Sequence, residues 1–261
     1  YQSRPDSIQH CLDVVRTGDI ENFLCLPFVP AAKRDAITAL RAFNVEVGRA
    51  ADKSTDSKLV EIRLHWWRSV VNGFGGEDPP YHPVVDSLAE AYHRYNLDPE
   101  LLFSIIDCRT DDLDTEIETV AQLETYAQGT QGALTQLALQ VLGADKHEQT
   151  VIAGEHVSKA IGICLLLRFS RIHALKNKFY IPKELQRANK LRLETMAQGE
   201  GTQELSQCVF ELAQIAQEHL RIAGECSPDR AGHPALYPAA IPRLFLKQLD
   251  GVHYDIMNPE L

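Results

Sequence analysis

Apolar residues recur at helical spacing along most of the chain, and the strand-like alternation of apolar and polar residues is absent. In residues 31–52, for example, they recur at Ile37, Leu40, Phe43 and Val47. No period of 20 to 50 residues repeats, which argues against a repeat architecture. The pattern predicts one all-α domain over residues 1–261. The expected helices cover residues 7–16, 20–28, 31–52, 58–71, 83–95, 99–113, 120–142, 147–174, 183–190, 202–224 and 234–249.

Proline and glycine mark several of the expected helix boundaries. Pro83 and Pro99 stand where the first turn of a helix accommodates proline. The Gly-Phe-Gly-Gly stretch at residues 73–76 follows a predicted helix instead of a strand, so we interpret it as a loop and not as a nucleotide-binding turn. Further breaks are expected around residues 177–182 and 199–201.

The composition is that of a globular protein with an acidic surface. The 261 residues are 44% hydrophobic and 24% charged, and the formal net charge is -10. Such a chain is a poor binder of nucleic acid, because phosphate contacts need clustered lysine and arginine. The six cysteines contain no CxxC pair, which predicts reduced thiols and no disulfide framework.

The longest uninterrupted apolar run, at residues 160–167, is much shorter than the roughly 20 residues that cross a bilayer. We therefore expect no transmembrane segment, while peripheral membrane contact stays open. The chain begins at Tyr1 and not at a methionine, which indicates a processed or truncated form whose targeting peptide is out of view.

Common catalytic and metal-binding motifs are missing. The chain has no GxxxxGK[ST], HExxH or GxSxG. His147 and His156 are nine residues apart, more than two helical turns, so one zinc ion cannot join them. The acidic residues Asp111 and Asp114 fit a solvated helix end, with contact to a basic partner as the alternative.

Four ordered segments resemble the squalene/phytoene synthase family. Residues 39–52 read ALRAFNVEVGRAAD, where the family carries a segment of the type ALYAWCRRTDELVD. Residues 63–68 resemble its RLxAWR, residues 106–114 its IDGMRMDLD, and residues 165–182 its NILRDVGEDARRGRIYLP region. The resemblance implies an all-α bundle of the trans-isoprenyl diphosphate synthase type.

The same resemblance implies a Mg²⁺ site that this chain has largely lost. Family enzymes join two prenyl diphosphates, with Mg²⁺ held by DxxxD motifs on two facing helices. The first motif falls on Gly48 and Asp52, and the second falls on Phe169 and His173. Three of the four carboxylates are therefore absent, and we expect no metal and no cofactor.

Three other family positions keep their residue type. Arg168, Tyr180 and Asp112 match the family's LRD, YLP and MDL elements, which makes them candidates for an anion or lipid cavity. The alternative for Arg168 is an ion pair with a neighbouring acid. For Tyr180 the alternative is a turn packed on the core.

One branch of the family departs from the enzymes in the same way. It comprises mitochondrial complex I assembly proteins, which also read ALRAFNVE and have acid-poor second motifs. Their stretches also resemble residues 125–131 and 254–261 here. This likeness implies a location in the mitochondrial matrix, with peripheral attachment to the inner membrane left open.

Three hypotheses follow. The first is a non-catalytic protein that contacts complex I subunits or other assembly proteins. The second is an atypical prenyltransferase that uses diphosphate substrates. The third is a protein that carries an isoprenoid lipid in the old cavity, and it is compatible with the first.

Overall fold

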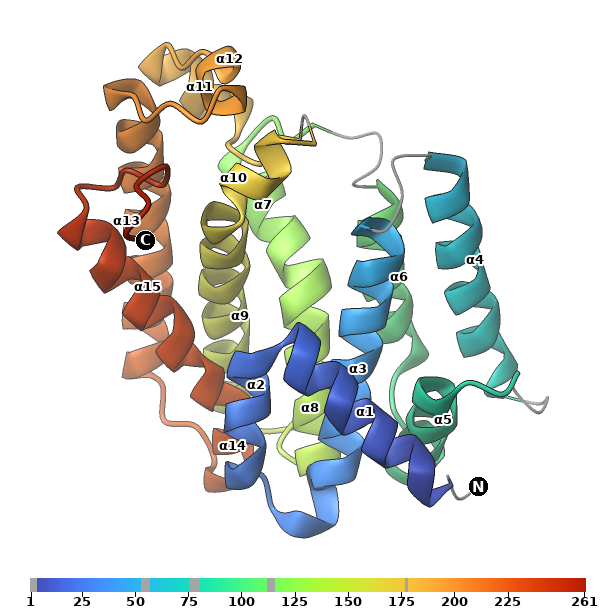
Figure 1. The fold of residues 1–261 in the computed structure, drawn as a ribbon. Coiled ribbons are helices and arrows are strands. Elements are labelled where there is room, and N and C mark those ends of the chain that lie inside the picture. Colours follow the sequence, from blue (N-terminus) through green and yellow to red (C-terminus); the bar gives the residue numbers. More distant parts are fainter. Residues whose placement is uncertain (1–3, 53–56, 76–79, 112–115, 177) are drawn as a thin grey trace.

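The structure is a computed structural model that describes residues 4–52, 57–75, 80–111, 116–176 and 178–261. Regular structure within these ranges is helical, and no strand occurs in them, which confirms the all-α prediction. Most of the longer helices run side by side (Figure 1). In chain order the helices are α1 (Pro5–Gly18), α2 (Ile20–Cys25), η1 (Leu26–Phe28), α3 (Ala31–Asp52), α4 (Ser57–Gly73), α5 (Pro83–Tyr95), α6 (Pro99–Asp111), α7 (Val120–Ala127), η2 (Gln128–Gly132), α8 (Ala133–Leu142), α9 (Glu148–Arg168), α10 (Ser170–Ala174), α11 (Lys183–Asn189), α12 (Leu193–Ala197), α13 (Gln203–Glu225), η3 (Arg230–Gly232), α14 (His233–Leu236), η4 (Tyr237–Ala239) and α15 (Ala240–Gly251).

Local side chains fix several helix ends. At the start of α7, the Thr119 hydroxyl accepts a hydrogen bond from the Gln122 N–H, while the Gln122 side chain accepts one from the Thr119 N–H. The Thr202 hydroxyl likewise accepts from the Leu205 N–H at the start of α13. Helix α8 ends at Gly143, whose φ of +70° lies in the left-handed region that favours glycine.

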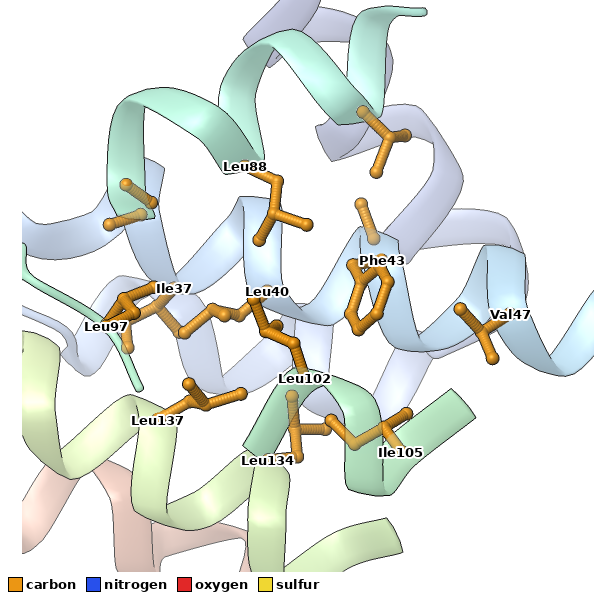
Figure 2. Close-up of a cluster of buried hydrophobic side chains, with 14 of the residues drawn as sticks. Ile37, Leu40, Phe43, Val47, Leu88, Leu97, Leu102, Ile105, Leu134 and Leu137 are labelled. Carbon is orange, nitrogen blue, oxygen red and sulfur yellow. The ribbon is translucent and has the colours of Figure 1, made fainter. Parts of the chain in front are cut away.

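One hydrophobic core surrounds α3. Its inward side chains meet residues of α5, α6 and α8 in the close-up of Figure 2. Phe43 is fully buried there, and its ring lies edge-on to Trp67 of α4 at 5.4 Å. The labelled members of this core are Ile37, Leu40, Phe43, Val47, Leu88, Leu97, Leu102, Ile105, Leu134 and Leu137.

A second core surrounds α9, which packs against α7, α8, α13 and α15. Within the described ranges, α9 is also the one helix long and apolar enough to cross a membrane, yet 67% of its most apolar window is buried inside the bundle. That degree of burial is typical of a core helix. The six cysteines, buried or half-buried, are all free thiols.

The structure corrects several helix boundaries. The helix expected over residues 147–174 is divided at Phe169 into α9 and α10. Residues 120–142 are helical throughout, as expected, but contain the π-helical turn η2. A short helix, α12, lies where no helix was expected. The helix expected over residues 234–249 begins as separate short turns, because Pro238 and Pro242 lack the N–H that a continuous helix needs.

Candidate functional site

The first motif position lies on a polar stripe of α3. Arg41, Asn44 and Gly48 follow one another at i, i+3 and i+7, so they share one helix face. A Cβ built at Gly48 would meet no atom within 4 Å, so Gly48 borders open space. The Asn44 side-chain oxygen is buried, and no described atom hydrogen-bonds to it. Asp52 ends α3, and its side chain lies outside the described part of the structure.

Arg41 brings a positive charge into the protein interior. Its residue is only 6% exposed, and burial lowers the pKa of the guanidinium below its ordinary value. Asp19, at the start of α2, acts in the opposite direction and favours the charged form. Arg41 was not predicted as a site residue, although its spacing of seven residues from Gly48 was an available signal.

The second motif position is aromatic where the family enzymes are acidic. Phe169 forms the junction between α9 and α10, and its ring lies 6.4 Å from that of His173. His173 contacts Tyr180 edge-on at 4.7 Å, and Tyr180 lies 6.0 Å from Tyr126. The Tyr126 hydroxyl accepts a hydrogen bond of 2.8 Å from Arg109. The structure therefore joins three of the predicted site residues, Phe169, His173 and Tyr180, in a row of rings.

Arg168 forms an ion pair with Glu21, the alternative that the sequence left open for it. Its Nη1 donates to Glu21 Oε1 of α2 at 2.5 Å, and its guanidinium carbon lies 5.8 Å from the centre of the Phe169 ring. This contact ties α2 to the end of α9. Asp112, the remaining candidate, lies outside the described residues.

The two motif segments lie at the same end of the bundle. In Figure 1, the C-terminal end of α3 and helix α10 are both near the upper end of the molecule. Helix α8 packs against both α3 and α9, so the two motif helices share a packing partner.

The chemistry of these donors does not fit Mg²⁺. This ion takes hard oxygen ligands in octahedral geometry, and neither Gly48 nor Phe169 has a side-chain oxygen. His173 offers an imidazole nitrogen, which suits softer transition metals. Among the described residues, no group of three or more histidine, cysteine or acidic side chains is placed to hold a metal ion.

A second polar cluster, which the sequence did not reveal, joins α7, α9 and α13. His156 Nδ1 lies 2.8 Å from His219 Nδ1, and His219 Nε2 lies 2.6 Å from Glu124 Oε1. Lys159 Nζ is 3.8 Å from the other Glu124 oxygen. His219 is only 8% exposed, so its hydrogen bonds form in a largely dry environment.

This cluster makes stability depend on pH. Burial lowers the pKa of His156 in the folded chain, and the nearby His219 and Lys159 lower it further. As the pH falls, the His156 imidazole binds a proton near pH 6.5 in the unfolded chain and at a lower pH in the folded chain. Proton uptake therefore favours unfolding. We expect the melting temperature to fall as the pH drops below about 6.5 and to fall less steeply in His156→Gln. An equally steep fall in the His156→Gln chain would contradict this assignment.

A surface groove of about 580 Å³ runs along α7, η2 and α8. Ser104, Glu124, Gln128 and Lys159 supply polar groups to its walls, and the described motif positions Gly48, Phe169 and His173 are not among its lining residues. The groove borders the segment 125–131, which includes the start of the π-helical turn. The groove is therefore separate from Gly48, Phe169 and His173.

Two helical glycines in different surroundings give a matched stability test. A Cβ at Gly162 of α9 would collide with Ala127, including its backbone Cα, whereas a Cβ at Gly48 meets nothing. We expect Gly162→Ala to lower the free energy of unfolding by about 1–3 kcal/mol through overpacking. Gly48→Ala should raise it by about 0.5–1 kcal/mol, since alanine favours helix. Urea unfolding measures both, and equal effects of the two changes would contradict the packing described for α9 and η2.

Comparison with known proteins identifies a matching family model. The model described as squalene/phytoene synthase matches residues 15–260. Among curated proteins, complex I assembly factor 6 of Rattus norvegicus is 32% identical over 98% of this chain and 78% of its own length. The Homo sapiens protein of the same name is 30% identical over 97% of this chain and 76% of its own length.

Solved structures of low sequence identity share the fold. A dehydrosqualene synthase determined with a ligand superposes with a TM-score of 0.84 at 19% identity, over 97% of this chain and 89% of its own. Squalene synthase HpnC from Alicyclobacillus acidocaldarius gives 0.81 at 17% identity, over 96% and 95% of the two chains. These similarities confirm the predicted bundle type.

Proposed function

The chain belongs to the squalene/phytoene synthase family, and from that premise we propose that it is a non-catalytic member that supports the assembly of respiratory complex I. The non-catalytic part of the proposal rests on the side chains that occupy the Mg²⁺-binding positions of the enzymes. Gly48 and Phe169 stand where the enzymes have carboxylates, and His173 replaces a third. Without bound Mg²⁺, the departing diphosphate lacks the cations that offset its charge as the allylic cation forms.

The curated relatives support the assembly part of the proposal. Relatives similar over nearly the whole of this chain are named complex I assembly factor 6. A protein that acts with complex I subunits or other assembly proteins would work in mitochondria, and we place this one on the matrix side, in peripheral contact with the inner membrane. Folded surfaces, rather than a reaction centre, would then carry its function.

The enzymatic test uses the purified chain with farnesyl or geranylgeranyl diphosphate and Mg²⁺. We expect no release of diphosphate above the blank, and none from Gly48→Asp either, because Phe169 and His173 still occupy the second motif. An active family enzyme serves as the positive control. Diphosphate release that disappears in Asp52→Asn would show that the site is active and the proposal wrong.

The cellular test asks what fails when the protein is absent. We expect its deletion to lower mature complex I while squalene, carotenoid and quinone precursors stay unchanged. An Asp52→Asn chain should restore complex I as well as the unmodified chain does. A primary fall in isoprenoids, or failure of a well-folded Asp52→Asn chain, would count against the proposal.

A second candidate function is the binding of a prenyl lipid near the old motif. The open space beside Gly48 favours it, since a packed site would offer no room. The Gly48→Leu side chain would fill this space and should abolish any binding of a fluorescent prenyl probe. Gly162 cannot serve as the control position, because a Cβ there already collides with Ala127. If Gly48→Leu leaves probe binding unchanged, the lipid does not lie there.

A further inference from the structure

Arg41 is a buried cation whose hydrogen-bond donors are unused. The residue is 6% exposed, yet within the described ranges no atom accepts a hydrogen bond from its guanidinium. Arg34, two turns earlier on α3, shows the usual arrangement, since it donates to the carbonyls of Leu26 and Val29 at 3.1 and 3.0 Å. Buried donors are nearly always paired with the protein, with water or with a bound group. The Arg41 guanidinium can therefore bind an acceptor from outside the chain.

The charge of Arg41 is only partly compensated inside the protein. Asp19, the N-cap residue of α2, attracts the guanidinium, but both of its carboxylate oxygens accept hydrogen bonds from the Asn22 amide. Burial lowers the pKa of Arg41 more than Asp19 raises it. Because an arginine keeps its proton in proteins, a second negative group beside Arg41 would be attracted to it.

Two further residues of α3 lie on the same helix face as Arg41. Asn44 follows at i+3, and its side-chain oxygen is buried without a hydrogen-bond partner among the described atoms. The amide can turn by 180° and present its nitrogen, so Asn44 can donate to an oxyanion beside Arg41. Gly48 follows at i+7, where a Cβ would meet no atom within 4 Å. This face of α3 thus leads from a buried cation, past an amide, to open space.

Helix α2 covers Arg41 without being buried itself. Asp19 and Cys25, at the two ends of α2, both act electrostatically on Arg41, and none of the six residues of α2 is buried. The Arg168–Glu21 ion pair ties this short helix to the end of α9. Segments with few buried groups open at a low free energy. A small ligand can therefore reach Arg41 through a movement of α2 while the rest of the bundle stays closed.

The charge at Arg41 limits which anion fits. Of the described residues, Asp19 and Cys25 act electrostatically on Arg41, and no second cation is among them. A diphosphate carries several negative charges and needs metal ions or more than one cation. A carboxylate carries one charge, and its two oxygens match the planar fork of a guanidinium.

From this geometry we infer that Arg41 and Asn44 bind the carboxylate of a small amphiphilic acid, without a metal ion. The guanidinium donates to both carboxylate oxygens, and the apolar part of the acid extends along α3 toward Gly48. The inference goes beyond the assembly role and beyond the diphosphate substrates of the family enzymes. It rests on the second candidate function only for the apolar part of the ligand.

Calorimetric titration of the full chain with sodium octanoate, at about pH 7.5 and without Mg²⁺, tests the inference. We expect octanoate to bind at least about tenfold more tightly than acetate, because its chain buries apolar surface near Gly48. Inorganic phosphate and farnesyl diphosphate, the probes for a phosphate ligand, should bind more weakly than octanoate. No binding of octanoate up to about 10 mM, or tighter binding of either phosphate compound, would overturn the inference.

Matched substitutions locate the carboxylate. Arg41→Met keeps much of the side-chain volume and should weaken octanoate binding about 10- to 100-fold, because charge-assisted hydrogen bonds are lost. Asn44→Asp leaves Arg41 in place and should weaken binding about tenfold through repulsion. Arg63→Met removes a cation from an exposed position of α4 and should change binding less than about twofold. Circular dichroism checks that the variants fold. Unchanged binding by a folded Arg41→Met chain would contradict the assignment.

The outcomes separate this inference from both candidate functions. Octanoate binding that needs Arg41, together with prenyl-probe binding that Gly48→Leu leaves unchanged, would support the carboxylate site and remove the prenyl lipid from this position. Prenyl-probe binding that needs Gly48 but is unaffected by Arg41→Met, without octanoate binding, would do the reverse. Normal complex I after deletion would remove the assembly role alone.

Discussion

Replacing Arg41 by glutamate should lower the free energy of unfolding by about 3–5 kcal/mol. Arg41 is 6% exposed, and Asp19, the N-cap residue of α2, acts electrostatically on it. A carboxylate in its place would be desolvated and would face Asp19, so attraction would become repulsion. We expect α2 to detach from α3 before the rest of the bundle unfolds, because the attraction between Arg41 and Asp19 and the Arg168–Glu21 pair favour its docked position.

Two further substitutions, one at Arg41 and one at an exposed arginine, separate the effect of charge from that of packing. Arg41→Met keeps much of the side-chain volume, and Asp19 still accepts two hydrogen bonds from the Asn22 amide. Its cost should stay within about 1–2 kcal/mol. Arg16→Glu makes the same change in net charge at an exposed position and should cost less than about 1 kcal/mol. Urea unfolding followed by circular dichroism measures all three, and similar costs for Arg41→Glu and Arg16→Glu would mean that Arg41 is not buried.

Replacing Phe43 by alanine should cost about 3–5 kcal/mol. The side chain is fully buried between α3, α4 and α5, where Figure 2 shows it among close apolar neighbours. Its removal loses the edge-on contact with Trp67 and leaves a cavity that rigid helices cannot close.

Phe28 provides the matched control for Phe43. It is 67% exposed and contacts Tyr237 at 5.7 Å, so Phe28→Ala should cost less than about 1 kcal/mol. A change in the combined fluorescence of Trp66 and Trp67 in the Phe43 variant gives an independent measure of the altered core. A Phe43→Ala protein as stable as Phe28→Ala would show that the core around α3 is not packed as described.

The sequence predicted the helices best where local signals were strong. The expected bounds of α3 and α5, residues 31–52 and 83–95, agree with the structure, because Pro30 precedes the first and Pro83 begins the second. The division at Phe169 was missed, since the surrounding residues contain neither glycine nor proline. Helix α12 was missed because five residues give too little periodicity to detect.

The candidate site, too, could be predicted only where the signal lies within a short stretch of sequence. Gly48, Phe169 and His173 were identified because each motif is defined by a short spacing along the sequence. The histidine cluster could not be identified, since His156 and His219 are 63 residues apart and no local pattern links them. Tertiary packing alone makes those two residues neighbours.

The π-helical turn η2 has a consequence for comparing this chain with its relatives. A π turn holds one residue more than an α turn over nearly the same rise, so the helical segments on either side keep the same orientation with or without that residue. Removing one residue from Gln128–Gly132 would restore an ordinary α-helix without rotating α8 relative to α7. Alignments within the family should therefore tolerate a single-residue gap at η2. The same gap in an uninterrupted α-helix would rotate the following apolar side chains by about 100° and turn them out of the core.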